Sequence, residues 1–167
     1  MEHLVTGIDM PQQPVGALRE EMERRIAALE GGPKIVVFGC DCAADARRLE
    51  SRDTAAMSLM CSGLLPPSFV EYALRSGADG VLVTGCREGS CAYRFGTRWT
   101  EGRLAGTREP HLRPSVPPER LRTAWADRAE AGHLAAALDA FRRHLQNMGA
   151  DENRPRAYTP RRIARHG

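Results

Sequence analysis

The residues of this 167-residue chain whose type and spacing point to chemistry are five cysteines, namely Cys40, Cys42, Cys61, Cys86 and Cys91. Cysteine thiolates bind zinc and iron and also act as nucleophiles. An odd number of cysteines does not fit a framework of disulfides. Residues 1–10 lack the apolar run of a secretory signal. We therefore expect free thiols in a cytoplasmic protein.

The elements that must position these cysteines alternate between strands and helices. Short apolar runs predict four strands, at residues 34–39, 54–60, 80–84 and 121–125. Amphipathic or proline-started segments predict helices at residues 15–29, 43–50, 66–76, 93–104 and 130–148. This alternation is typical of an α/β domain, in which helices cover both faces of a parallel sheet of about four strands.

The cysteines follow the ends of the predicted strands. Cys40, Cys61 and Cys86 come after the first, second and third strands, and Cys42 and Cys91 lie only a few residues further along. The carboxyl ends of parallel strands open on one edge of the sheet, where ligands bind. We therefore expect thiols from distant parts of the sequence to meet at that edge.

Converging thiolates match the ligand count of both zinc and iron–sulfur sites. Structural zinc sites usually combine two C-x2-C pairs, whereas this chain has one C-x-C, one C-x4-C and a single cysteine. The C-x4-C spacing also occurs in plant-type [2Fe–2S] proteins. An interaction module held by a four-cysteine zinc site stays open as the alternative. A thiol enzyme that uses Cys40 or Cys42 as its nucleophile, or simple packing of small apolar side chains, also stays open.

Three segments resemble the delta subunit of methyl-viologen-reducing hydrogenase: residues 60–63 (MCSG), 77–86 (GADGVLVTGC) and 89–93 (GSCAY). The resemblance extends from about residue 34 to residue 149. It implies a flavodoxin-like domain with one [2Fe–2S] cluster and no catalytic residues of its own. It also implies two partners, which are a flavin-containing heterodisulfide-reductase-A-like subunit and an electron-donating oxidoreductase subunit.

The resemblance also assigns ligands. Cys61, Cys86 and Cys91 match the second and third cysteine motifs of the family. The first motif, usually F-x-C-x-x-C, is one residue shorter here, which leaves the fourth ligand open between Cys40 and Cys42. The family pattern GCHxGDCHY has lost both histidines and its acid, since this chain has Arg87, Ser90 and Ala92 at those positions.

The composition divides the chain into three parts. We expect an N-terminal extension with an amphipathic helix over residues 1–33, the iron–sulfur domain over 34–149, and a basic, mobile tail over 150–167. The helix either caps the domain's own core or docks on a partner, and we favour docking. The net charge is only +3, and the basic residues are interspersed with acids, so we expect no nucleic-acid partner. The sequence contains no apolar run long enough for a membrane span.

Overall fold

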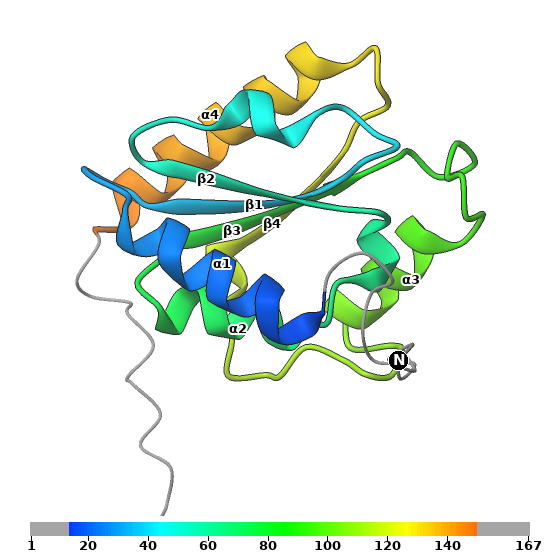
Figure 1. Cartoon of the computed structure of the whole chain (residues 1–167), viewed down its shortest axis with the longest axis horizontal. Helices are drawn as coiled ribbons and strands as arrows, with labels where there is room; N and C mark the ends of the chain where they lie inside the picture. The colour runs from blue at the N-terminus through cyan, green and yellow to red at the C-terminus, as the bar shows by residue number, and fades with distance from the viewer. Residues whose placement is uncertain (1–13, 150–167) are drawn as a thin grey trace, which may run out of the picture.

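Four parallel strands form the centre of the protein, seen here in a computed structural model that describes residues 14–149 (Figure 1). Their bounds are β1 Ile35–Cys40, β2 Thr54–Leu59, β3 Gly80–Gly85 and β4 Leu121–Trp125. The strand order is β2-β1-β3-β4, and all pairs are parallel. This order follows that of flavodoxin-like sheets, whose ligand crevice lies between β1 and β3. The predicted α/β fold class is confirmed.

Helices cover both faces of the sheet. The α-helices are α1 Val15–Ala27, α2 Ser68–Arg75, α3 Gly96–Leu104 and α4 Ala131–Met148, and the short 3₁₀ helices are η1 Ala46–Leu49, η2 Ser62–Leu64 and η3 Pro118–Arg120. Figure 1 shows α1 and α2 on one face and η1 and α4 on the other, with α3 beyond the carboxyl ends of the strands. Within residues 14–149, none of the helices combines the length and the apolar character that crossing a membrane requires.

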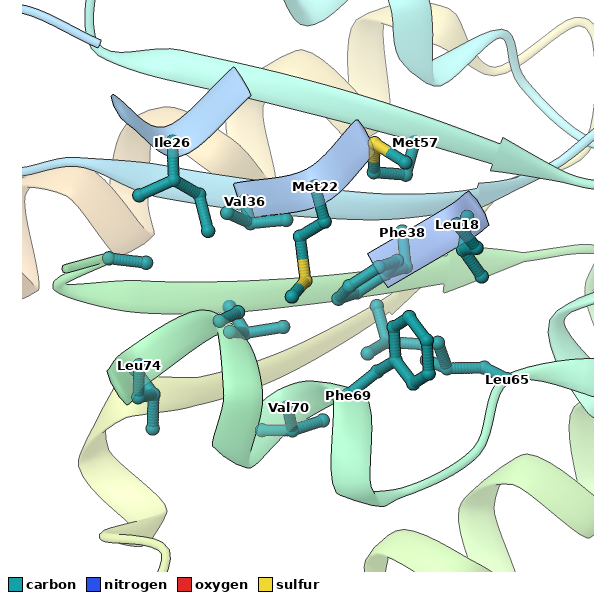
Figure 2. Packing of buried hydrophobic residues seen from close by; sticks show 14 of the residues in the cluster. Leu18, Met22, Ile26, Val36, Phe38, Met57, Leu65, Phe69, Val70 and Leu74 are labelled. Atoms are coloured by element: carbon teal, nitrogen blue, oxygen red, sulfur yellow. The ribbon is translucent and has the colours of Figure 1, made fainter. Parts of the chain in front are cut away.

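Helix α1 packs into the core of the domain. Leu18, Met22 and Ile26 recur at four-residue intervals, so they lie on one face of the helix, and all three are buried. Figure 2 shows them next to Val36 and Phe38 of β1, in the cluster that the apolar face of α2 completes. The expectation that this helix docks on a partner is wrong, because its apolar face covers the protein's own sheet.

Helix α4 covers the opposite face of the sheet as its spacing predicts. Four side chains on one face of α4 are buried, namely Leu134, Leu138, Phe141 and Leu145. They pack on Ile35, Val37 and Leu82 of the sheet. A Cβ atom on Gly80 would lie 2.6 Å from Leu145 and 2.7 Å from Phe141, so the glycine at the start of β3 lets α4 approach the sheet closely.

Two predicted helices differ in detail from the structure. The segment expected as a helix over 93–104 turns helical only at Gly96, after a turn in which Arg94 takes a φ of 66°. The piece expected over 43–50 is the short helix η1, whose N-cap Asp45 accepts a hydrogen bond from the Arg47 N–H at 3.1 Å. The predicted tail over 150–167 lies outside the described residues, and the division of the chain into three parts stays a prediction.

Candidate functional site

The structure brings the cysteines together at the carboxyl edge of the sheet. Cys40 is the last residue of β1, Cys86 follows β3 directly, and Cys61 lies two residues after β2. Cys40 and Cys86 form a small buried cluster, and Cys42 and Cys91 pack against it. All five thiols are free, as expected. Cys40 and Cys86 flank the point between β1 and β3 at which sheets of this order bind ligands.

Backbone N–H groups point at these sulfur atoms. The N–H of Cys42 donates to Sγ of Cys40 at 3.4 Å, and the N–H of Gly63 donates to Sγ of Cys61 at the same distance. The Cys40 thiol lies 3.7 Å from the carbonyl oxygen of Met60. Donors arranged in this way stabilise negative charge on sulfur, which is the form in which cysteine binds a metal.

The thiols shift one another's pKa values. The thiol of Cys61 donates a hydrogen bond to Cys40 and, together with the N–H groups of Cys42 and Ser62, lowers the pKa of Cys40 to about 5 against the effect of burial. The same hydrogen bond to Cys40 raises the pKa of Cys61, and burial adds to this rise. Burial and the nearby Cys40 raise the pKa of Cys86 to about 12. Cys40 is therefore the most acidic of these three thiols, and a metal that bound them would displace their remaining protons.

The pKa values of two neighbouring groups rise as well. Burial, followed by the charge of Cys40, raises the pKa of Cys42. Partial desolvation and the charges of Cys42 and Cys61 raise the pKa of Tyr93. Tyr93 follows Cys91 by two residues, and its side chain is half exposed.

Two glycines leave room for the sulfur atoms. A Cβ atom on Gly96, the first residue of α3, would collide with Sγ of Cys61 and would lie 3.1 Å from Sγ of Cys91. A Cβ atom on Gly63 in η2 would lie 2.9 Å from Cα of Gly96. The backbones of η2 and α3 therefore touch directly next to two thiols. This contact joins distant segments, and no sequence pattern indicates the role of Gly96.

The loop after β4 holds both cysteine loops in place. Asp127 accepts hydrogen bonds from the backbone N–H of Arg87 and from Oγ of Ser90, each at 3.0 Å. Arg128 donates to the carbonyl oxygens of Asp41, at 3.2 Å, and Cys42, at 3.4 Å. One short segment thus fixes the loop between Cys86 and Cys91 and the loop after Cys40.

A bidentate ion pair strengthens this arrangement. The guanidinium of Arg87 donates to both carboxylate oxygens of Glu130, at 2.6 and 2.8 Å, and the N–H of Asp127 also donates to Glu130, at 2.9 Å. Sequence reasoning did not single out Asp127, Arg128 or Glu130. The available signal was their position directly after the fourth strand, at the same edge as the cysteines.

The donor set fits an iron–sulfur cluster by its chemistry. A [2Fe–2S] cluster takes four thiolates, shared between two irons, and benefits from N–H groups that donate to sulfur. This edge offers five thiols and such donors. Within residues 14–149, no three His, Cys, Asp or Glu side chains already stand where together they could hold a single metal ion. Metal binding by the cysteines accordingly stays a prediction.

Fold and site together define a class: parallel α/β domains that gather cysteines at the carboxyl edge of the sheet. The family model described as methyl-viologen-reducing hydrogenase, delta subunit, matches residues 34–149, and the chain belongs to this family. The matched range contains all five cysteines and the loop after β4.

Two kinds of relative are similar to this chain. The A subunit of the ferredoxin:CoB-CoM heterodisulfide reductase of Methanosarcina mazei is 38% identical over 90 residues, which are 54% of this chain and 11% of that protein. The same figures hold for the A subunit of the ferredoxin/F(420)H(2)-dependent enzyme of Methanosarcina acetivorans. The iron-sulfur D subunit of the F420-non-reducing hydrogenase of Archaeoglobus profundus is 29% identical over 128 residues, which are 72% of this chain and 93% of that protein. This chain therefore spans a small part of the first kind of relative and nearly the whole length of the second.

Proposed function

We propose that this chain is an electron-transfer subunit that holds one [2Fe–2S] cluster at the carboxyl edge of its sheet. The observation that carries the proposal is the meeting of thiols from β1, β2 and β3 at an edge supplied with backbone N–H donors. The name of the Archaeoglobus relative, which calls it an iron-sulfur subunit, supports the choice of iron over zinc. When bound, the cluster supplies reversible one-electron transfer.

We further propose Cys40, Cys61, Cys86 and Cys91 as the four ligands. Cys40 ends β1, is only 3% exposed and shares hydrogen bonds with the thiols of Cys61 and Cys86. Cys42 instead turns its backbone N–H toward Sγ of Cys40. In this assignment Cys42 orients and stabilises a ligand through its backbone and keeps its own thiol free.

The residues around the ligands control the reduction potential. Hydrogen bonds to sulfur stabilise the more negative, reduced state and raise the potential, whereas burial of charge opposes reduction. The N–H groups of Cys42 and Gly63 act in the first way, and the low exposure of Cys61 and Cys86 acts in the second.

The relatives support a flavin-containing heterodisulfide-reductase-A-like subunit as the partner. A segment similar to this chain is part of the reductase A subunit in two Methanosarcina species. The same kind of domain, as a separate D subunit, belongs to hydrogenases. We propose that this chain relays electrons between an electron-donating oxidoreductase subunit and such a reductase partner, in the cytoplasm, where thiols stay reduced.

Anaerobic purification of the full chain tests this function. We expect a brown protein with about two iron and two sulfide per chain, whose visible absorption bleaches on reduction with dithionite. A colourless protein with one zinc would contradict the proposal in favour of the zinc module. A metal-free protein with a reactive thiol would contradict it in favour of a thiol enzyme.

The ligand assignment needs a matched pair of variants. Cys40→Ser should lose most of the iron, whereas Cys42→Ser should keep the iron content and the absorption spectrum of the wild type. Equal loss in both variants, or loss only in Cys42→Ser, would overturn the choice of Cys40.

A further inference from the structure

Exposed large hydrophobic side chains gather on the elements that adjoin the thiols. The large hydrophobic residues that stand exposed within residues 14–149 are Leu64, Tyr93, Phe95 and Trp99. They lie on η2, on the turn after Cys91 and on α3, and η2 contacts α3 directly. Phe95 and Trp99 stack with ring centroids 5.9 Å apart. We call these four residues, which are three aromatic side chains and one leucine, the aromatic patch. Exposed apolar residues that cluster in this way mark a contact site on a soluble domain.

Arginines without acidic partners surround the aromatic patch. Among the described residues, no carboxylate pairs with Arg94, Arg98 or Arg108. The guanidinium of Arg108 stacks over Trp99, 4.5 Å from the ring centroid. By contrast, Glu101, the acid on α3, already accepts a hydrogen bond from Nε1 of Trp125. The rim of the patch is therefore basic, and its centre is aromatic.

Position links the aromatic patch to electron transfer. Cys40, Cys61 and Cys86 are at most 5% exposed, so a partner cannot touch them directly. Tyr93, two residues after Cys91, is 51% exposed, and α3 begins at Gly96, where a Cβ atom would meet Sγ of Cys61 and Sγ of Cys91. The patch is therefore a point where the surface comes close to the thiols. Because electron tunnelling slows steeply with distance, a redox partner gains rate by docking there.

We propose that the aromatic patch and its three arginines form the docking surface for the redox partner, and that the partner presents an acidic rim around an apolar centre. This inference rests on the proposed function and adds to it the surface and the chemistry of the contact. Aromatic residues and arginine carry much of the binding energy in interfaces. Complementary charge at the rim speeds association and makes it dependent on salt.

Binding to the purified reductase partner tests the docking surface. The full chain is purified anaerobically from its own cells, the reductase-A-like partner is identified by mass spectrometry, and that protein is then titrated with each variant. Arg98→Glu combined with Arg108→Glu should weaken binding about tenfold and remove its salt dependence. Trp99→Ala should weaken binding about thirtyfold. Arg143→Glu is the matched control and should bind as the wild type does, because it reverses a charge at an exposed position of α4, which covers a face of the sheet, whereas α3 lies beyond the carboxyl ends of the strands.

The outcomes separate the two proposals. Iron content and far-UV circular dichroism verify that each variant is folded and loaded. If the reductase partner binds all variants as tightly as the wild type, the docking surface is wrong while the electron-transfer function stands. If the arginine reversal tightens binding, the partner surface is basic and the proposed charge complementarity is wrong. If no reductase-A-like protein binds the wild type, the proposed partner, and with it this inference, fails.

Discussion

Glycine at position 96 is the residue on which the arrangement of the thiols depends most directly. Its missing side chain leaves space that Sγ of Cys61 occupies, with Sγ of Cys91 also close by. The backbone of Gly96 is not in the left-handed region. Glycine is therefore needed at this position because a larger side chain would not fit, and not because of its φ angle. Two ligands proposed to share one cluster thus depend on a residue that provides no atom to it.

Gly96→Ala should displace these two thiols and reduce metal binding. Overpacking of this kind costs about 1–3 kcal/mol, because the neighbouring atoms must move. We expect iron per chain to fall to roughly half of the wild-type value or less. Gly132→Ala on α4 is the control, since its Cβ would meet no atom within 4 Å. Iron content after anaerobic reconstitution measures the effect, and equal iron in both variants would contradict it.

At the residue scale, the sequence predicts which cysteines meet but not what surrounds them. Cys40, Cys61 and Cys86 follow strands, and the geometry of a parallel sheet brings strand ends to one edge. The contact of Gly63 with Gly96 depends instead on how η2 packs on α3, and no local pattern encodes that packing.

At the scale of elements, the loop after β4 acts as a brace for the loop between Cys86 and Cys91. Asp127→Ala removes the acceptor of two hydrogen bonds, from Arg87 and Ser90. We expect a loss of about 1–3 kcal/mol in the free energy of unfolding, because charged acceptors form the stronger hydrogen bonds. Amide hydrogen exchange of residues 87–91 should become faster.

The control for this variant is Asp139→Ala on α4. Asp139 is 59% exposed and pairs with Arg142 at the surface, so its removal should cost less than about 0.5 kcal/mol. Urea unfolding of the metal-free proteins compares the two variants. Equal losses, or unchanged exchange in the loop, would show that Asp127 does not brace it.

The ion pair in the same brace makes a prediction about pH. Hydrogen bonds from Arg87, followed by the N–H of Asp127, lower the pKa of Glu130 from its ordinary value of 4.5 to about 2. Because the lowered pKa favours the ionised folded state, the stabilisation is complete above pH 4.5 and disappears as the pH falls toward 2. Carbon-13 NMR of the Glu130 carboxyl should show a midpoint near 2, which Arg87→Gln should move toward 4.5. A wild-type midpoint already near 4.5 would refute the pairing in solution.

The helices and strands themselves follow from sequence patterns, whereas the surfaces against which they pack do not. The periodicity of Leu18, Met22 and Ile26 predicts a helix with one buried face. The same periodicity says nothing about which surface buries that face, which is why the interpretation of α1 as a docking helix is wrong. The later start of α3 has a local cause, since Arg94 adopts a φ of 66° that a helix does not accept.

At the scale of the whole molecule, the residues that stabilise the fold and the residues of the candidate site occupy different parts of the sheet. The two faces of the sheet hold the apolar clusters under α1, α2 and α4. The carboxyl edge holds the thiols, and the aromatic patch adjoins it. Variation along this edge, for example at Arg87, Ser90 and Ala92, can therefore change the site without loss of the core.

The family match begins at residue 34, yet the core of this chain extends further toward the N-terminus. Without α1, the cluster that contains Val36, Phe38 and Met57 would lose Leu18, Met22 and Ile26 and would be partly exposed to water. We therefore expect residues 34–149 alone to aggregate or to bind a hydrophobic dye, whereas the full chain unfolds cooperatively.

Met22→Ala in the full chain should cost about 2–5 kcal/mol, because Met22 is completely buried. Glu20→Ala at an exposed position of the same helix should change the free energy of unfolding by less than about 0.5 kcal/mol. A stable, monomeric fragment 34–149, together with a small effect of Met22→Ala, would show that α1 is dispensable and would return it to the role of a partner-binding helix.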